Sequence, residues 1–129
     1  MVPKFRGWDR KNHVMYDFMM MCFYVNLKNV LYRNTLTDFD VDMCTGLKDA
    51  NGKEIYENDI IKYFGANKRV KIKTTYGIVF YDSEHGCFNS RIQNEEHNKG
   101  GISPLNDLIV GNVHNNPELL EVQHDTRTD

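Results

Sequence analysis

The sequence predicts a mainly β protein, and three observations support this prediction. Polar and apolar residues alternate with a period of two over residues 37–42 and 70–76, as in strands that bury one face. Turn-forming residues interrupt the apolar runs at residues 49–52 and 82–86, because Asn, Asp and Gly tolerate the backbone angles of tight reversals. Successive runs on both sides of Gly77 give the pattern of a β-meander.

The amino-terminal part begins with a predicted hairpin. Residues 5–8 and 13–16 flank the polar stretch 9–12, which suits a turn. The apolar run 18–24 is open to two interpretations. It either pairs with residues 30–32 in a second hairpin or forms a helical turn.

An acidic strand follows at residues 37–42. Its alternation places three aspartates on one face: Asp38, Asp40 and Asp42. Their spacing is that of the first ligands of a calcium loop, but Met43 stands where the sharp turn requires glycine, and Asp49 where glutamate is required. We therefore expect no calcium here. Because the three carboxylates repel each other, we expect either a positive group opposite them or a solvated face.

Clear turn signals separate the strands of the second half. The 49–52 turn leads to residues 53–56, and residues 57–59 form a corner in which Asp59 can accept backbone N–H groups. Further strands are expected at residues 60–64, 70–76, 78–81, 87–88 and 108–113.

The last third of the chain is less regular. The polar stretch 93–101 is expected to be a loop, and Gly111 interrupts the closing strand. Residues 117–120 suit a short helical turn that Asn116 caps, and residues 123–129 a frayed tail.

Length and composition limit the class of protein. A chain of 129 residues suits one domain, which buries roughly two-thirds of its unfolded surface. The net charge of -2 gives no global field toward nucleic acid or anionic lipid, so such a partner requires a local patch. No segment approaches the ~20 apolar residues that span a bilayer, and residues 1–6 lack the apolar stretch of a secretory signal. We therefore expect a cytosolic protein without membrane contact.

Several sequence blocks occur in a recognisable order. They read Phe-Arg-Gly-Trp-Asp at residues 5–9, Thr-Gly-Leu-Lys-Asp at residues 45–49, Glu-Asn-Asp-Ile-Ile at residues 57–61, and Val-Gly-Asn-Val-His-Asn-Asn-Pro-Glu-Leu-Leu at residues 110–120. Together they resemble the YopX family of phage and prophage proteins. Where that family usually has glycine before Asp59, this chain has Asn58, which still tolerates a left-handed backbone.

The resemblance implies a single YopX-like domain over residues 1–129. Within it, residues 1–44 would form an N-terminal β region and residues 45–122 a small SH3-like β-barrel. The family brings no established activity, so no catalytic residue and no cofactor can be carried across.

The densest positive charge lies on and just before the predicted strand 70–76. Its residues are Lys68, Arg69, Lys71 and Lys73, and the aromatic residues Tyr63, Phe64 and Tyr76 flank them. These cations stay solvated, pair with the acidic strand across a sheet or between protomers, or bind nucleic acid. Aromatic side chains on small barrels stack on bases, so nucleic-acid binding through residues 68–76 is the alternative function.

A run of methionines gives a second candidate surface. It comprises Met19, Met20, Met21 and Phe23. Methionine adapts to irregular partner surfaces, but core packing is the favoured interpretation. An exposed run would be a surface for self-association or for a partner protein.

The residue types of common reaction centres are present without the required spacing. Cys22, Cys44 and Cys87 are odd in number and widely spaced, which predicts reduced, buried thiols and neither disulfides nor a zinc site. His85 precedes Cys87 by two residues, but no residue that would orient the imidazole is evident, so we expect His85 in a turn. We therefore expect a non-catalytic interaction module that self-associates or binds a partner protein, without metal or cofactor.

Overall fold

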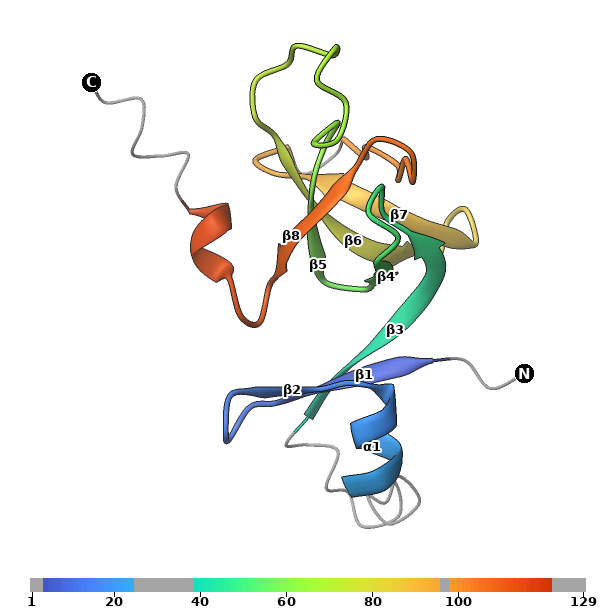
Figure 1. Ribbon diagram of the computed structural model, residues 1–129, viewed down its shortest axis with the longest axis vertical. Helices are drawn as coiled ribbons and strands as arrows, with labels where there is room; N and C mark the ends of the chain where they lie inside the picture. Colours follow the sequence, from blue (N-terminus) through green and yellow to red (C-terminus); the bar gives the residue numbers. More distant parts are fainter. Residues whose placement is uncertain (1–3, 25–38, 96–97, 122–129) are drawn as a thin grey trace. The chain divides into compact units, whose positions relative to one another are not determined.

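The protein is mainly β, as predicted. The computed structural model describes residues 4–24, 39–95 and 98–121 (Figure 1). Its elements are β1 (Phe5–Asp9), β2 (Val14–Tyr16), α1 (Phe18–Tyr24), β3 (Phe39–Lys48), β4 (Glu54–Tyr56), β5 (Asp59–Lys62), β6 (Tyr76–Asp82), β7 (Cys87–Ile92), β8 (Leu108–Asn112) and the 3-10 helix η2 (Pro117–Leu120). The strands form two four-stranded antiparallel sheets, of order β2-β1-β3-β4 and β7-β6-β5-β8, and the second curls into a half-barrel.

The chain divides into two compact units. The first is Met1–Cys44 and the second Thr45–Asp129, so the boundary falls within β3. The single-domain organisation expected from the sequence stays a prediction.

The predicted N-terminal hairpin is confirmed. β1 pairs with β2 in antiparallel register from Gly7↔Tyr16 to Asp9↔Val14. The carboxylate of Asp9 organises the turn, because its Oδ1 accepts the backbone N–H groups of Lys11 at 2.9 Å and Asn12 at 3.1 Å. Such an acceptor replaces the hydrogen bonds that the backbone loses on leaving the strand.

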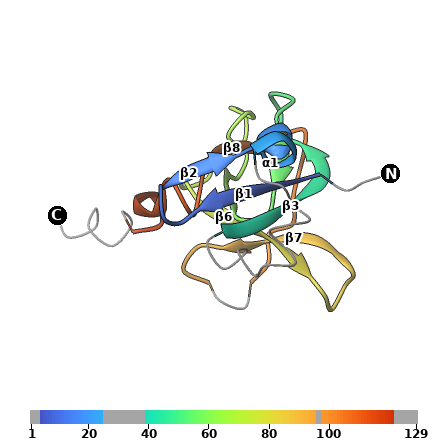
Figure 2. The same cartoon turned by 90° about the horizontal axis from the view of Figure 1, so that it is seen from below.

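The run 18–24 is a helix and not a strand. Asp17 supplies the cap that the strand interpretation overlooked, since its Oδ1 accepts the N–H of Met20 at 2.8 Å. Figures 1 and 2 both show α1 beside the β1–β2 hairpin, where Phe18 packs edge-on against Phe5 with ring centroids 5.2 Å apart. Residues 30–32, the predicted partner of this run, lie outside the described residues.

The acidic strand lies beside arginines of the hairpin. β3 pairs with β1, and Nε of Arg6 lies 3.0 Å from Oδ2 of Asp42 in a largely buried ion pair. The exposed Arg10 lies 2.6 Å from Asp40. These arginines supply the positive charge expected opposite the aspartates, and a fully solvated acidic face is wrong for the buried Asp42. Asp38 lies outside the described residues.

The predicted corner at residues 57–59 is confirmed in the second unit. The buried Asp59 accepts the N–H of Tyr56 at 2.7 Å through its Oδ2. Asn58 has a φ of 66°, the left-handed conformation that its side chain was expected to tolerate. β5 starts at the last residue of this corner, Asp59, and buries Ile61 in a core with Ile55 and Val79.

The closing strand and the final turn match the prediction except for the cap. The β5–β8 register shifts between Ile60, which pairs with Gly111, and Ile61, which pairs with Ile109. A Cβ at Gly111 would lie 2.5 Å from Oδ1 of Asn116, so only glycine fits here without displacing that side chain. The same Oδ1 accepts the N–H of Asn112 at 3.3 Å, and the Asn116 side chain does not cap η2. The predicted Asn116 side-chain cap is therefore wrong.

The predicted strand over residues 70–76 is also wrong. β6 begins only at Tyr76, which pairs with the last residue of β5, Lys62. Residues 70–75 therefore have no β5 residue left to pair with, and they form a loop that the Tyr63 N–H to Thr75 carbonyl bond closes at 3.0 Å. The alternation of polar and apolar residues over 70–76 predicted that Ile72 would lie on a buried face, but its side chain is 48% exposed.

The ring of Tyr63 fills a space that two glycines leave open. Its hydroxyl bonds to the hydroxyl of Ser90, and a Cβ on Gly77 or on Gly100 would meet this phenol well inside van der Waals contact. The side chain of Tyr63 is therefore held between β6 and the 100–101 segment.

Gly77→Ala is expected to destabilise the protein by about 1–3 kcal/mol, because the added methyl forces Tyr63 to move within a packed core. Urea unfolding measures the loss. In a Tyr63→Phe background the same substitution should cost less, since the nearest atom to the new methyl is the phenol oxygen. An equal cost in both backgrounds would contradict the packing described.

Candidate functional site

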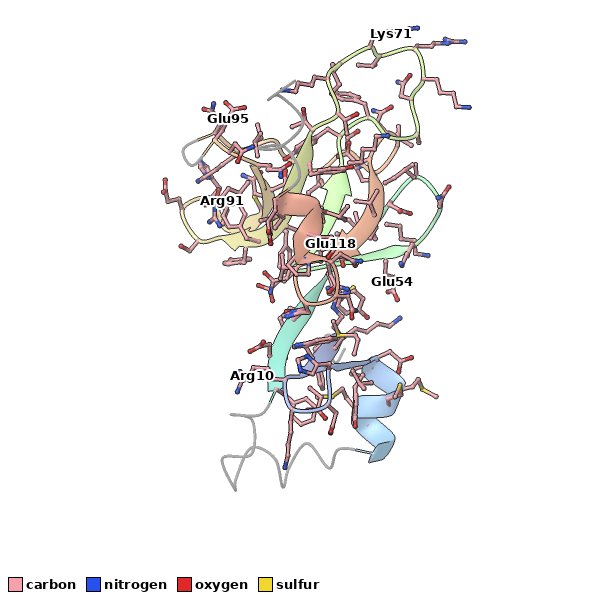
Figure 3. All side chains as sticks on the ribbon, turned by 90° about the vertical axis from the view of Figure 1, so that its left-hand side faces the viewer. Arg10, Glu54, Lys71, Arg91, Glu95 and Glu118 are labelled. Carbon is pink, nitrogen blue, oxygen red and sulfur yellow. The ribbon has the colours of Figure 1, made fainter. Side chains whose placement is uncertain are left out.

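The most prominent surface of the described chain is the cationic loop, which we define as residues 66–73. Its cations are all exposed: Lys68, Arg69, Lys71 and Lys73. Figure 3 shows Lys71 at the far end of this loop, away from the strands of the half-barrel. Val70 and Ile72 are exposed between the charges. The loop therefore combines positive charge with aliphatic surface.

A second turn, at residues 103–107, holds the base of the cationic loop. Ala66 donates its N–H to the carbonyl of Asn106 at 2.9 Å, and Nδ2 of Asn67 donates to Oδ1 of Asn106 at 3.0 Å. The buried Asp107 accepts the N–H of Phe64 at 3.0 Å and that of Ser103 at 2.8 Å. The base is thus fixed by hydrogen bonds, while the charged side chains remain in solvent.

An open hollow lies beside this base. Its volume is about 470 Å³, and Lys68, Arg69 and Leu105 contribute to its lining. Leu105 is 86% exposed, the largest exposed fraction among the large apolar residues described. Neither Leu105 nor Asp107 was predicted as part of a surface, because their role depends on the pairing of two loops distant in sequence.

The structure brings together only part of the predicted nucleic-acid site. The four cations share one loop, but Tyr63 is in the core and Tyr76 is half-buried at the start of β6. Burial raises the pKa of the Tyr63 phenol above its ordinary value, and the phenol is engaged with Ser90. The Tyr63 ring is therefore not presented for stacking on a base.

The predicted methionine surface is divided between core and solvent. Met21 is fully buried against the first unit's core, where Phe5 lies, whereas Met19 is 63% exposed and Met20 is half-buried. The side chain of Phe23 lies outside the described residues. Helical geometry explains the division, because adjacent residues of α1 face different directions.

A buried carboxylate at the end of β6 organises the 82–86 turn. Oδ2 of Asp82 accepts hydrogen bonds from Nζ of Lys99 and Nδ1 of His85 at 2.9 Å and from Nδ2 of Asn89 at 3.1 Å. Its Oδ1 accepts the N–H of Glu84 at 3.1 Å. The bond from Lys99, followed by that from His85, holds the pKa of Asp82 well below its usual range, and the bond to Asp82 raises the pKa of Lys99.

His85 lies in a turn, as predicted, but the expectation that nothing orients its ring is wrong. Asp82 contacts Nδ1 directly, and the spacing of three residues within a turn was the signal that could have indicated this pair. Cys87 and Cys22 are exposed and Cys44 is partly buried, so the prediction of buried thiols is wrong, although all three are free.

The arrangement defines a small, mainly β protein with a cationic loop as its charged surface. Among the described residues, no group of three or more His, Cys, Asp or Glu side chains is placed to hold a metal ion. In the same residues, no helix is long and apolar enough to cross a membrane.

The family model described as YopX protein matches residues 4–121, so the chain belongs to the YopX family. The crystal structure of protein EF1440 from Enterococcus faecalis is similar, with a TM-score of 0.60 and 22% sequence identity over 93% of this chain and 99% of that chain. This likeness shows the fold alone. No curated protein matches the chain.

Asp82→Asn is expected to make the free energy of unfolding depend less on pH in the acidic range. Because the pKa of Asp82 is lowered by folding, the ionised carboxylate stabilises the fold above its unfolded pKa of ~3.9. That stabilisation is lost as the pH falls through the lower folded value. The free energy of urea unfolding, measured from neutral to strongly acidic pH, should therefore fall less steeply in the variant.

Glu84→Gln is the matched control, since Glu84 lies in the same turn and is exposed. In this control the free energy of unfolding should fall as steeply with decreasing pH as in the unaltered protein. Identical slopes for the unaltered protein and Asp82→Asn would show that Asp82 does not carry the effect.

Proposed function

We propose that this protein is a phage- or prophage-encoded interaction module that acts without catalysis in the host cytosol. In this proposal the half-barrel is a small SH3-like barrel, and it presents the cationic loop to an acidic surface of a partner protein. The observation that supports it best is the exposure of aliphatic and cationic side chains on one loop with a fixed base.

The composition of the loop favours a protein partner. The side chains of Val70, Ile72 and Leu105 are exposed to water. Covering them with an apolar surface lowers the free energy of the complex. The four cations would steer an acidic partner toward the loop and fix its orientation. A protein surface offers carboxylates and apolar side chains together, whereas a phosphate backbone offers only charge.

Nucleic acid is the alternative partner. The cations alone would give weak, salt-sensitive binding to DNA or RNA. Stronger binding to a single strand uses aromatic rings, and Tyr63 contributes none because its ring is buried. A second copy of this chain remains a candidate for the acidic partner, because the net charge of -2 leaves acidic residues in excess over basic ones.

The described polar clusters support a role without catalysis. Asp82 and Asp107 each accept several hydrogen bonds from their own turns and from residues distant in sequence, so their oxygens are committed to the fold. The imidazole of His85 uses Nδ1 to bind Asp82. A reaction centre would require a nucleophile, a base and an orienting group that converge in one pocket.

Lys71→Glu combined with Lys73→Glu is expected to weaken partner binding at least about tenfold, because two attractive charges become repulsive. Affinity capture from lysate of the natural host, with and without nuclease treatment and added salt, measures the effect. Lys48→Glu combined with Lys53→Glu is the matched control, since it changes the net charge equally at exposed positions outside the loop.

A captured protein that the control retains and the loop variant loses would support the proposal. Equal capture by both variants would overturn it. Binding that disappears after nuclease treatment, together with direct binding of DNA or RNA to the purified protein, would replace it with the nucleic-acid alternative. Light scattering would identify the partner as a second copy of this chain if the unaltered protein and the control variant are dimers and the loop variant is a monomer.

A further inference from the structure

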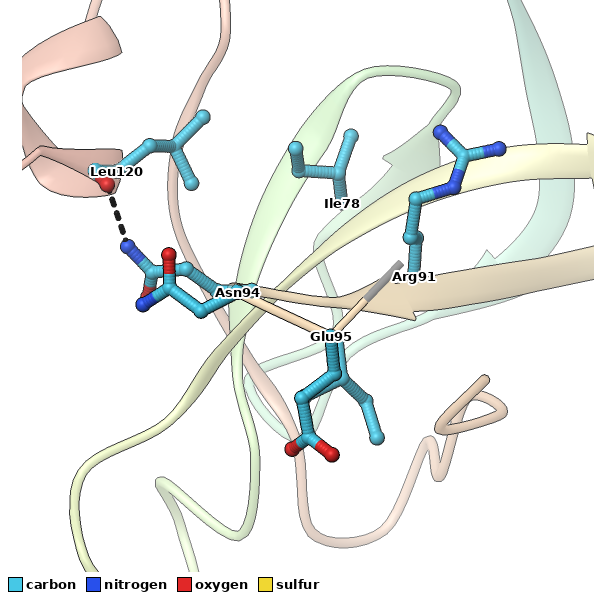
Figure 4. A pocket seen from close by; sticks show the side chains of 7 residues that line it. Ile78, Arg91, Asn94, Glu95 and Leu120 are labelled. Atoms are coloured by element: carbon cyan, nitrogen blue, oxygen red, sulfur yellow. Dashed lines mark hydrogen bonds between the residues drawn. The ribbon is translucent and has the colours of Figure 1, made fainter. Parts of the chain in front are cut away.

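We infer that the partner of the cationic loop is a second copy of this chain, and that Leu105 of one copy enters a second hollow on the other. This hollow, which we call the η2 hollow, has a volume of about 210 Å³ and is bordered by β6, β7 and η2 (Figure 4). The inference rests on the proposed function and deepens it, because it names the partner of the same loop.

Leu105 is presented by a turn with a fixed shape. The carbonyl of Ser103 accepts the N–H of Asn106 at 3.0 Å and that of Asp107 at 2.8 Å. Oδ2 of Asp107 in turn accepts the N–H of Ser103 at 2.8 Å, and the ring of Pro104 fixes its own φ. Leu105 is 86% exposed on this turn. Binding through Leu105 therefore does not require the ordering of a flexible loop, which reduces its entropy cost.

The exposure of Leu105 determines which kind of surface can cover it. A flat surface covers one side of a side chain that projects from a turn, whereas a hollow surrounds it and removes more apolar area from water. A cavity of ~150 Å³ holds benzene, while sites for whole small molecules have volumes of roughly 300–1,000 Å³. A leucine side chain has fewer carbon atoms than benzene, so one such side chain fits the 210 Å³ of the η2 hollow.

The lining of the η2 hollow suits an aliphatic side chain. Ile78, Ile92 and Leu120 contribute to it, and Figure 4 shows Leu120 extending towards Ile78. All three side chains are half-buried, so each keeps some exposed area for a ligand to contact. Figure 4 also shows the carboxylate of Glu95 pointing away from Ile78 and Leu120. A leucine side chain in the hollow would therefore contact aliphatic groups from more than one element.

The surroundings of the η2 hollow are acidic. Glu95 contributes to its lining, and the exposed Glu118 and Glu121 lie on either side of Leu120 in the chain. Arg91 also lines the hollow, so three carboxylates lie around it with one guanidinium. The excess negative charge favours an apolar side chain that arrives together with cations.

Leu105 has such cations beside it. Lys68 and Arg69 line the same hollow of the cationic loop as Leu105, and both side chains are exposed. As Leu105 enters the η2 hollow of a second copy, these two cations would approach the carboxylates around it. The charges would orient the contact and make it sensitive to salt.

One copy cannot bring these two surfaces together. The turn that carries Leu105 precedes the first residue of β8, and η2 follows its last residue, so they lie at opposite ends of this strand (Figure 1). Figure 3 likewise shows Lys71 well apart from Glu95 and Glu118. Complementary surfaces that are held apart within one molecule can meet only between two molecules.

Sedimentation equilibrium of the full chain tests the inference. The unaltered protein should associate as its concentration is raised, and Leu105→Ala should weaken this association at least about tenfold, because the apolar contact is lost. Val110→Ala is the matched control, since Val110 is an exposed aliphatic residue outside both hollows, and it should associate normally. An unaltered protein that stays monomeric, or equal association by Leu105→Ala, would overturn the inference.

An exchange of charges tests whether the two surfaces meet. Lys68→Glu with Arg69→Glu makes the surroundings of Leu105 acidic, and Glu95→Lys with Glu118→Lys makes the rim of the η2 hollow basic. Each double variant alone should associate at least about tenfold more weakly, because like charges then face each other. An equimolar mixture should recover the association, since opposite charges meet again, and a mixture without recovery would overturn the inference.

The two double variants also differ in overall charge, so the mixture needs a control. Adding Leu105→Ala to both variants keeps their charges and removes the apolar contact, so this mixture should not recover. Full recovery there would show a general attraction between the variants and overturn the inference.

Capture from host lysate separates failure of this inference from failure of the proposed function. A host protein that the loop captures, from a chain that itself stays monomeric, would overturn the contact between copies and support the proposed function. Association that Leu105→Ala weakens would support the contact between copies. If Lys71→Glu with Lys73→Glu then changed neither this association nor the capture, the proposed role of the loop charges would be overturned.

Discussion

Buried aspartates satisfy the backbone at the corners of this fold. A strand that reverses direction leaves N–H groups without sheet partners, and each must find another acceptor. Asp9, Asp49, Asp59, Asp82 and Asp107 are all buried, and each accepts at least one backbone N–H from a neighbouring turn. A carboxylate has two acceptor oxygens and a short side chain, so it suits such corners. The geometry of the β fold therefore depends on short acceptor side chains placed at its turns.

Two of these aspartates also connect turns that are distant in sequence. Oδ2 of Asp49 accepts the N–H of Ile109 at 3.0 Å, and Oδ1 of Asp107 accepts that of Phe64 at 3.0 Å. Such long-range bonds determine which loops lie side by side, so they position the base of the cationic loop against residues 103–107. The turn chemistry thereby sets where the charged surface is presented.

The sequence predicted features whose cause is local. The β1–β2 hairpin and the Asn58 corner depend on turn residues within a few positions, and both were confirmed. The strand at residues 70–76 was wrong because strand formation requires a partner, and β5 ends too early to supply one. The helix at residues 18–24 was ambiguous because a short apolar run fits either periodicity, and the cap at Asp17 decides between them.

The candidate sites show the same division between features with a local cause and features that depend on distant residues. Four cations within residues 68–73 were visible in the sequence, but the exclusion of Tyr63 from their surface depends on Gly77, Ser90 and Gly100, which come together only in the folded chain. The burial of Gln93 had no sequence signal, since glutamine in a polar stretch is ordinary, and its bond to the Leu120 carbonyl joins segments distant in sequence. Sequence patterns therefore indicate where charge is concentrated, while the burial of individual side chains depends on contacts between distant segments.

Stability accounts for the buried aspartates and leaves two features without a role in the fold. The cationic loop exposes four positive charges and two aliphatic side chains, which no contact among the described residues requires. Gln93 anchors η2 through its nitrogen, so its buried oxygen is a cost that an apolar residue would avoid. Folded proteins are only marginally stable, so exposed aliphatic and cationic side chains without a structural role are the reason that a binding function is proposed for the loop. In the function proposed here, the charge of the cationic loop orients an acidic partner and its aliphatic side chains supply the apolar contact.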